Sequence, residues 1–202
     1  MTCPASPVLV FDLGGVIVDH DNAVMHRRLA SGCRPDMSVE HIAALTGDER
    51  WGTGRPVIEL FDQLREQAGY TGDRAGFVAD WCCHLVLNPS MLAFVEGLAA
   101  RHRVIIFSNT NHEHWNYVVA ASGGRLGAFE RVLSHEIGHA KPSAMAFEIL
   151  SNTAGVRPEG LLFFDDVATN VEGARRAGLR AELFENEAVL RAFLTARGLY
   201  AA

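Results

Sequence analysis

The chain has 202 residues, enough for one domain or for one core that carries a smaller insert. Hydrophobic residues make up 49% of it and charged residues 21%, which excludes a disordered chain, a collagen-like chain and a pure coiled coil. The net charge is −6 at pH 7 and no basic patch stands out, so neither nucleic acid nor an anionic membrane is the expected partner.

The first part of the chain favours a cytoplasmic location. The opening residues lack the positive charges of a signal peptide, and the apolar run that follows stops at Asp12. No run approaches the length of about 18 apolar residues that a membrane span needs. The cysteines lack metal or redox spacing, so we expect reduced thiols at Cys3, Cys33, Cys82 and Cys83.

Short apolar runs alternate with helical patterns along most of the chain. Residues 8–11 form a continuous apolar run, as in a strand buried on both faces, and similar runs follow at 104–107, 161–164 and, more weakly, 181–184 and 131–133. Apolar residues at helical spacing lie between these runs, at 91–100, 144–153 and 170–177. The alternation predicts an α/β fold, a parallel sheet with helices on both faces.

The segment 21–87 has a different pattern, without a clear buried strand. It predicts helices near 23–31, 38–45, 55–68 and 73–87. We therefore expect two domains: an α/β core from residues 1–20 and 88–202, and a helical insert from residues 21–87.

Each strong core strand is followed by polar side chains. Asp12 follows the first, Ser108 to Asn111 the second, and Asp165 with Asp166 the last. Ligands of open parallel sheets bind beyond the carboxyl ends of the strands. One such cluster alone would be explained as a helix cap. Three clusters at one edge predict a site.

The residue types at this edge indicate the chemistry. Carboxylates packed together repel one another unless a cation lies between them. Oxygen ligands without a pair of histidines favour Mg²⁺ over Zn²⁺, and Mg²⁺ commonly binds a substrate phosphate as well. A carboxylate that attacks phosphorus forms an aspartyl-phosphate, which replaces one difficult displacement by two easier ones.

Four segments resemble the ordered motifs of the haloacid dehalogenase superfamily: FDLGGVIVD at 11–19, FSNTN at 107–111, HAKP at 139–142 and FFDDVATNVEGARRAGL at 163–179. The resemblance covers the core from residue 8 to about 185 and implies a Rossmann-like fold. The variants are similar to the bacterial sugar-phosphatase branch, which includes an α-glucose-1-phosphate phosphatase. The helical insert lies where that branch carries its cap.

The resemblance implies a set of metal ligands. Asp12 would be the nucleophile and a Mg²⁺ ligand, and the Gly14 carbonyl and the Asp166 carboxylate would bind the same ion. Asp165 would orient Asp166 or hold a metal-bound water. Asn170, one helical turn further on, would bind another water or lie on the helix surface.

The resemblance also implies a set of phosphate ligands. Ser108 would hold a phosphoryl oxygen, with the Asn109 amide beside it. Lys141 would pair with both Asp12 and the phosphate. The alternative for Lys141 is a solvated surface lysine, the usual place of that residue type.

One departure from the family pattern concerns Gly14. At this position most phosphatases of the superfamily have a second aspartate, which acts as the general acid and then as the general base. Its loss removes a contribution of about 10²–10⁴ to the reaction rate. The sugar-phosphatase branch shares the glycine. Water or a residue in the connection to the insert would have to serve, and Asp19, His20 and Asp21 are candidates there. As an alternative, these three are solvated hinge residues.

Substrate specificity is expected from the insert. Trp51 is a candidate for stacking on a sugar ring, with Arg50 or Glu49 bonding hydroxyls; alternatively, Trp51 packs the insert against the core. The segment from His112 to Trp115 would border the entrance. The spacing of its two histidines does not indicate a zinc site, and the other histidines form no cluster in the sequence.

The leading hypothesis is a Mg²⁺-dependent phosphatase of a small phosphorylated metabolite, with a sugar phosphate as the first guess. A metal-independent 2-haloacid dehalogenase is the second hypothesis, and the adjacent Asp165 and Asp166 argue against it. A non-catalytic metabolite-binding member of the superfamily is the third, favoured only by Gly14. The sequence leaves both a monomer and a homodimer open.

Overall fold

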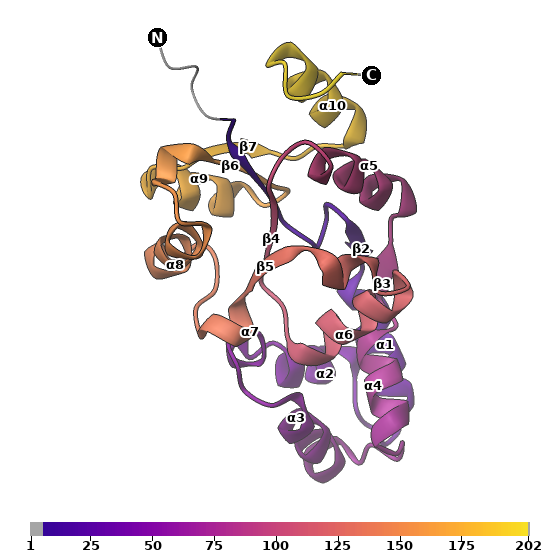
Figure 1. The fold of residues 1–202 in the computed structure, drawn as a ribbon. Coiled ribbons are helices and arrows are strands. Elements are labelled where there is room, and N and C mark those ends of the chain that lie inside the picture. The colour runs from indigo at the N-terminus through magenta and orange to yellow at the C-terminus, as the bar shows by residue number, and fades with distance from the viewer. Residues whose placement is uncertain (1–5, 202) are drawn as a thin grey trace.

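A computed structural model describes residues 6–201 (Figure 1). The predicted thiol at Cys3 lies outside this range, whereas Cys33, Cys82 and Cys83 are free cysteines. Within the described range no helix combines the length and the apolar composition needed to cross a bilayer.

A five-stranded sheet forms the centre of the core. Its strand order is β5-β4-β1-β6-β7, and every neighbouring pair is parallel. The predicted α/β fold is therefore confirmed, including the weaker candidate strands. The strands are β1 (Val8–Phe11), β4 (Val104–Ser108), β5 (Glu130–Leu133), β6 (Leu161–Asp165) and β7 (Arg180–Leu183).

Helices cover both faces of this sheet (Figure 1). One face packs against α5 (Pro89–Ala99), α6 (His112–Ala121) and α10 (Glu187–Ala196), and the other against α8 (Ala144–Ala154) and α9 (Ala168–Arg176). Short elements complete the core: η3 (Arg125–Ala128), α7 (Ser134–Ile137) and η4 (Pro158–Gly160).

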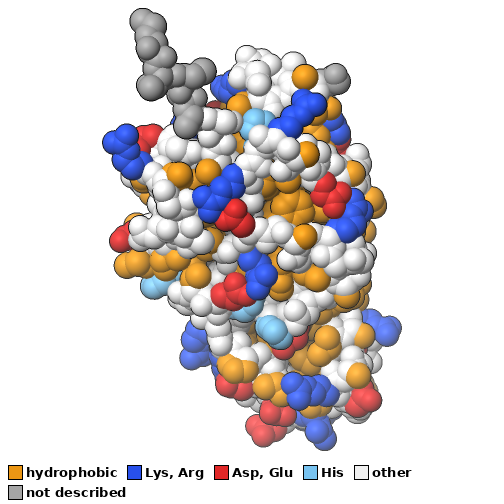
Figure 2. Space-filling view, in the orientation of Figure 1, with side chains coloured by type: hydrophobic (Ala, Val, Ile, Leu, Met, Phe, Trp, Pro, Cys, Tyr) orange, Lys and Arg blue, Asp and Glu red, His pale blue; other side chains and the backbone are white. Residues whose placement is uncertain are grey.

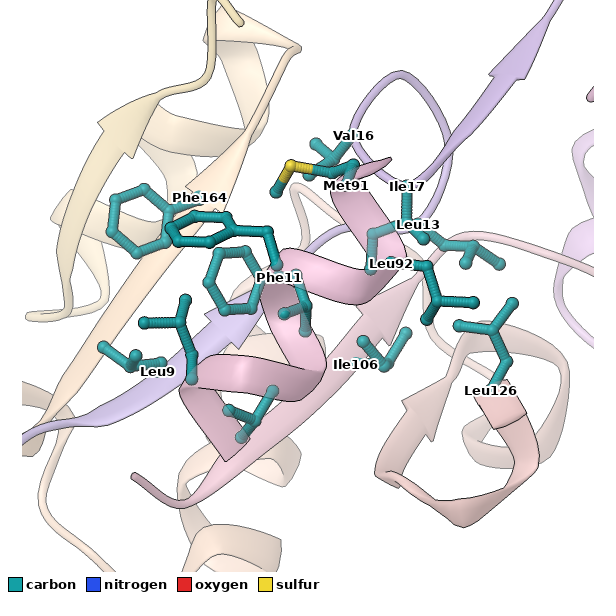
Figure 3. Close-up of a cluster of buried hydrophobic side chains, with 14 of the residues drawn as sticks. Leu9, Phe11, Leu13, Val16, Ile17, Met91, Leu92, Ile106, Leu126 and Phe164 are labelled. Atoms are coloured by element: carbon teal, nitrogen blue, oxygen red, sulfur yellow. The ribbon is translucent and has the colours of Figure 1, made fainter. Parts of the chain in front are cut away.

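Burial on both faces explains the continuous apolar runs. Leu9 and Phe11 of β1 face the cluster under α5, whereas Val8 and Val10 face the opposite cluster. Figure 3 shows Phe11 beside Phe164 of β6, with ring centroids 5.2 Å apart. Burying a side chain of this size contributes roughly 1.5–3 kcal/mol. The central strands, whose ends carry the polar clusters, are thus rigidly held.

Residues 22–82 form what we call the helical segment, at the lower end of the view in Figure 1. Asp21, Ser38 and Asp73 cap three of its helices through their side chains. The segment has its own buried apolar cluster, around Leu60 and Phe77. Its elements are α1 (Asn22–Ser31), α2 (Val39–Thr46), η1 (Glu49–Gly52), α3 (Val57–Gln63), η2 (Leu64–Ala68) and α4 (Arg74–Cys82).

The prediction of one helix over 73–87 is wrong in its second half. Helix α4 ends at Cys82, and β3 (Leu85–Leu87) pairs antiparallel with β2 (Val18–His20). Leu85 and Leu87 are only partly buried, so this strand lacks the buried apolar pattern of the core strands. The two strands form a ribbon through which both connections between the helical segment and the core pass.

Charged side chains of both signs are interspersed over the face shown in Figure 2, in accord with the mixed charge of the sequence. On that face the lower end, formed by the helical segment, carries acidic and basic groups side by side. This mixture gives the visible face no large field of one sign.

Candidate active site

The carboxyl ends of β1 and β6 bring three acidic residues together. One carboxylate oxygen from each of Asp12, Asp165 and Asp166 lies within 4.8 Å of the other two. Asp12 and Asp165 are buried, whereas Asp166 is partly exposed. The convergence expected from the strand ends is therefore present in the fold.

A buried lysine lies within this cluster. The Lys141 Nζ is 2.8 Å from Asp12 Oδ1 and 2.7 Å from Asp165 Oδ2, and it donates to the Phe107 carbonyl at 3.0 Å. Its side chain is 0% exposed, so the surface-lysine alternative is wrong. Three acceptors match the three N–H donors of an ammonium group.

Lys141 is the only lysine of the chain; arginine supplies all the other side chains that carry a formal positive charge at pH 7. A compact ammonium group has room between two carboxylates where a planar guanidinium would not. The three donors of Lys141 are directed at protein acceptors. In this structure the lysine acts on Asp12 and Asp165, and its direct contact with a phosphate stays a prediction.

Asn109 holds the backbone of Lys141. The Asn109 Nδ2 donates to the Lys141 carbonyl at 2.8 Å, and the Lys141 N–H donates to Asn109 Oδ1 at 2.8 Å. Asn109 also lines the candidate pocket, so the predicted contact of its amide with a phosphate stays a prediction. In this structure Asn109 fixes the place of the lysine.

Asp165 is fully buried and surrounded by donors. Its Oδ1 accepts from the Val167 N–H at 2.8 Å and from Asn170 Nδ2 at 3.1 Å, and its Oδ2 accepts from Asn170 Nδ2 at 3.1 Å as well as from Lys141. Asn170 is buried, so the alternative of a helix-surface residue is wrong, whereas it lines the pocket and its role as a water ligand stays a prediction. Asp165 therefore serves first as the partner of Lys141.

The environment of Asp12 opposes its ionisation. Burial raises the pKa of Asp12 to about 7; the charge of Lys141 lowers that pKa, and the charge of Asp165 raises it. Burial also raises the pKa of Asp166, with the charge of Asp165 as the second cause. One ammonium cannot neutralise three carboxylates, so the cluster attracts a further cation. Carboxylate oxygens suit a hard ion such as Mg²⁺.

The sequence profile of the haloacid dehalogenase-like hydrolases matches residues 7–178. The chain belongs to this family. The match includes the segments that supply Asp12, Lys141 and Asp166.

Three curated relatives carry phosphatase names. D-ribitol-5-phosphate phosphatase of Bacteroides thetaiotaomicron is 28% identical over 200 residues, covering 93% of this chain and 96% of that protein. Fructose-1-phosphate phosphatase YqaB of Escherichia coli is 21% identical over 175 residues, covering 86% of this chain and 93% of that protein. A shorter match to Phosphatase MT3486 of Mycobacterium tuberculosis is 45% identical over 58 residues and spans 29% of this chain and 27% of that protein.

Solved structures share the fold of this haloacid dehalogenase-like chain. A crystal structure of a HAD family enzyme from Bacteroides thetaiotaomicron superposes with a TM-score of 0.82 at 23% identity, covering 93% of this chain and 98% of that chain. A complex of that enzyme with magnesium and inorganic phosphate superposes with a TM-score of 0.76 at 23% identity, covering 91% of this chain and 98% of that chain.

A pocket of about 300 Å³ opens above the acidic cluster of this haloacid dehalogenase-like protein. Asp12, Gly14, Ser108 and Asp166 lie on its core side. Ser108 is 3% exposed, and it lines this pocket at the carboxyl end of β4. A ligand in the pocket would therefore meet this residue. The ribbon, the helical segment and α6 supply further lining residues: Val18, His20, Asn22, His84, Leu85, His114 and Val118.

Three histidines that are far apart in the sequence meet at this pocket. His20, His84 and His114 all line it, and the rings of His84 and His114 are 5.1 Å apart. Burial lowers the pKa of His84 to about 4 and that of His114 to about 3. The sequence interpretation missed this cluster because three separate elements carry it, and no local spacing links them.

The low pKa of His84 predicts a pH-dependent cost to stability. Its imidazole titrates at 6.5 in the unfolded chain and at about 4 in the folded one, so the unfolded state binds more protons between these values. Lowering the pH from 7 to 5 should therefore stabilise His84→Gln relative to the wild type by about 1–2 kcal/mol. Urea unfolding of both proteins at the two pH values measures this difference.

Each variant is compared with the wild type because the raised pKa of Asp12, present in all these proteins, makes the free energy of unfolding fall as the pH rises. This effect is opposite in sign to that of His84. The same change at the exposed His139 is the matched control, and His139→Gln should follow the wild type at both pH values. An equal response of His84→Gln and His139→Gln would contradict the prediction.

Trp51 does not line this pocket; it belongs to the buried cluster of the helical segment and borders an adjoining cavity that shares Asn109 and His114 with the pocket. It is 3% exposed, and the Arg55 guanidinium lies 4.0 Å from the centroid of its ring. A ring enclosed in this way has little surface for stacking on a sugar, and its apolar neighbours belong to the helical segment itself, so the alternative that it packs the insert against the core stays a prediction. Nearby, the Ser134 hydroxyl donates to the Gly52 carbonyl and ties this part of the segment to the core.

Proposed function

We propose that the protein is a Mg²⁺-dependent phosphatase of small phosphorylated metabolites that works through an aspartyl-phosphate on Asp12. The observation that carries this proposal is the meeting of Asp12, Asp165 and Asp166 within 4.8 Å at the base of a pocket. Such a cluster suits a divalent cation and an anionic substrate together.

Asp12 is oriented for attack through one of its two oxygens. Its Oδ1 accepts from the Leu13 N–H at 2.7 Å and from Lys141 Nζ at 2.8 Å. The other oxygen, Oδ2, is therefore the nucleophile. It forms a bond to phosphorus while the ester P–O bond breaks and the alcohol leaves. Water then attacks the phosphoryl group, releases inorganic phosphate and regenerates Asp12.

Asp12, Asp166 and the Gly14 carbonyl would hold the metal, because they border the pocket. A bound Mg²⁺ would neutralise charge on the phosphoryl oxygens and fix the phosphate in place. Asp165 has both oxygens engaged by protein donors, so we assign it to positioning Lys141. The Ser108 hydroxyl would bind a phosphoryl oxygen.

The absence of a side chain at Gly15 leaves the space that the Asp166 carboxylate occupies. Its φ is +70°, and a Cβ added to it would lie 2.0 Å from Asp166 Oδ2. Gly15→Ala should therefore lower the free energy of unfolding by about 1–3 kcal/mol. Because Asp166 must move, the Mg²⁺ concentration for half-maximal activity should rise about 10-fold or more.

Gly14→Ala is the matched control for stability. A Cβ at Gly14 meets nothing closer than 3.6 Å, and the backbone there does not have a positive φ. Gly14→Ala should unfold at a urea concentration close to that of the wild type. If Gly15→Ala were equally stable and had unchanged Mg²⁺ dependence, the role assigned to Asp166 would be wrong.

The helical segment would act as a cap, with the domain boundaries at residues 21–87 for the cap and at 1–20 and 88–202 for the core. Two features support this proposal. The segment has its own apolar cluster, and the pocket has walls from both sides of the β2–β3 ribbon. Closure of the segment over the pocket would exclude water from the phosphoryl group.

A sugar phosphate or sugar-alcohol phosphate is the proposed substrate class. The relatives named for ribitol 5-phosphate and fructose 1-phosphate are matched over 93% and 86% of this chain. Both compounds are small polyol phosphates. A pocket of about 300 Å³ is of the size that small ligands occupy.

The proposal is tested by measuring phosphate release from a panel of phosphorylated metabolites with Mg²⁺ and with EDTA. We expect hydrolysis of sugar or polyol phosphates that EDTA abolishes and added Mg²⁺ restores. Full activity in EDTA, or chloride release from 2-chloropropionate in place of phosphate release, would contradict it. The latter result is what the dehalogenase alternative predicts.

A further inference from the structure

We propose that His20 is the proton donor to the leaving oxygen of the substrate, in the position that Gly14 leaves without a side chain. This inference rests on the proposed phosphatase function.

The proposed reaction needs such a donor. An alcohol leaves as an alkoxide unless it receives a proton, and a positioned acid contributes about 10²–10⁴ to the rate of such a step. Lys141 directs its three donors at protein acceptors and is 0% exposed. Asp165 is fully buried beneath the pocket, and Gly14 has no side chain.

The imidazole of His20 lies where a side chain on Gly14 would point. A Cβ built on Gly14 would be 3.6 Å from both Nδ1 and Cε1 of His20. The backbone around the ring is held in place, because Gly15 N–H donates to the Val18 carbonyl at 2.9 Å and His20 pairs with Leu85 in the ribbon. The ring therefore lies beside Gly14 and lines the same pocket as Asp12.

The other candidates from the sequence do not have this placement. Asp21 caps helix α1 by accepting from the Ala23 N–H at 2.9 Å, and neither Asp19 nor Asp21 lines the pocket. His84 and His114 do line it, but their buried rings are neutral near pH 7 because their pKa values are about 4 and 3. His20 is exposed at the pocket wall.

His20 also belongs to a wall of the pocket in which the leaving oxygen would lie. In an in-line displacement that oxygen lies opposite the attacking oxygen of Asp12. The ribbon, which carries His20, supplies one wall of this pocket. His20 on that wall gives its N–H proton to the leaving oxygen as the ester bond breaks. The neutral ring then takes a proton from the water that attacks the phosphoryl-Asp12, which restores the starting state.

The test compares two leaving groups in wild type and His20→Gln. p-Nitrophenolate leaves without a proton, whereas the more basic phenolate benefits from one. With Mg²⁺ present, His20→Gln should lower kcat/KM for phenyl phosphate about 100-fold and that for p-nitrophenyl phosphate far less. Equal losses on both substrates, or no loss on either, would overturn the role of His20.

A second pair of variants separates proton donation from packing. Placed in the His20→Gln background, Gly14→Asp supplies a new acid and should recover much of the phenyl phosphate activity. Gly14→Asn in the same background has nearly the same shape but no acidic proton, and it should recover none. Failure of Gly14→Asp to recover activity, or equal recovery by both, would contradict the inference.

These outcomes are distinguishable from a failure of the proposed function. If the wild type with Mg²⁺ hydrolyses neither aryl phosphate, or if Asp12→Asn hydrolyses p-nitrophenyl phosphate as well as the wild type does, the phosphatase mechanism itself is wrong and the role of His20 falls with it. If wild-type hydrolysis needs both Mg²⁺ and Asp12 but is indifferent to His20, only the inference about His20 is wrong.

Discussion

Replacement of Lys141 by methionine is expected to damage both stability and activity. Removing the ammonium leaves Asp12 and Asp165 buried, close together and without their shared partner. Loss of one partner from a buried ionic group costs about 3–5 kcal/mol. Urea unfolding should show this loss, and kcat/KM should fall by at least about 10³-fold because Asp12 is no longer oriented.

Two further variants make this test specific. Lys141→Arg should not restore the wild-type stability, because the larger guanidinium has no room there. The lysine side chain is 0% exposed, and its Nζ lies 2.7–3.0 Å from three acceptors. Arg176→Met removes a basic residue from an exposed ion pair and should change the free energy of unfolding by less than about 1 kcal/mol. A Lys141→Met protein as stable as Arg176→Met would contradict the role of the buried cluster.

Asp12→Asn is expected to lose activity while gaining stability. Loss of the attacking carboxylate should reduce kcat/KM by about 10⁴-fold or more. The pKa of Asp12 is raised by burial to about 7, above its ordinary value of 3.8, so the folded state binds the extra proton. Stability is therefore lost as the pH rises through 7. At pH 8 in EDTA, the neutral asparagine should have the higher free energy of unfolding.

A loss of activity together with a gain in stability distinguishes a chemical effect of Asp12→Asn from misfolding. Asp165 remains the partner of Lys141 in the variant, so the lysine stays paired. Asp19→Asn, at an exposed position of the ribbon, is the matched control and should change neither property much. An Asp12→Asn protein that is inactive and also less stable than the wild type at pH 8 would show that Asp12 is needed for folding, contrary to this account.

The sequence was sufficient to predict the core strands and the convergence of their polar ends. Strands β1, β4 and β6 are buried on both faces, so each appears as a continuous apolar run ending in a polar residue. Parallel pairing then brings those ends to one edge. This is why Asp12 and Asp166 were found from local pattern alone.

The ribbon could not be predicted in the same way. β2 and β3 are three residues long and partly exposed, which is too short for any periodic pattern. Each depends on a partner strand far away in the chain. Because the ribbon also places His20 beside Gly14, the relation between these two residues is visible only in the folded chain.

The contacts of the site were likewise decided by long-range geometry. Asn109 and Lys141 are 32 residues apart, and nothing local indicates that the amide of one holds the backbone of the other. One signal was available, since a single lysine in a chain of arginines indicates a specific role for that side chain. For Trp51, burial depends on packing partners such as Arg55 rather than on its own segment.

The most direct test of the central claim is to trap the phosphoryl group on the enzyme. Acid quenching during turnover of radiolabelled p-nitrophenyl phosphate with Mg²⁺ should leave label on the peptide that contains Asp12, and hydroxylamine should release it as it does other acyl phosphates. Asp12→Asn should carry none. Turnover without label on that peptide, or label that persists in Asp12→Asn, would contradict the assignment of Asp12 as the nucleophile.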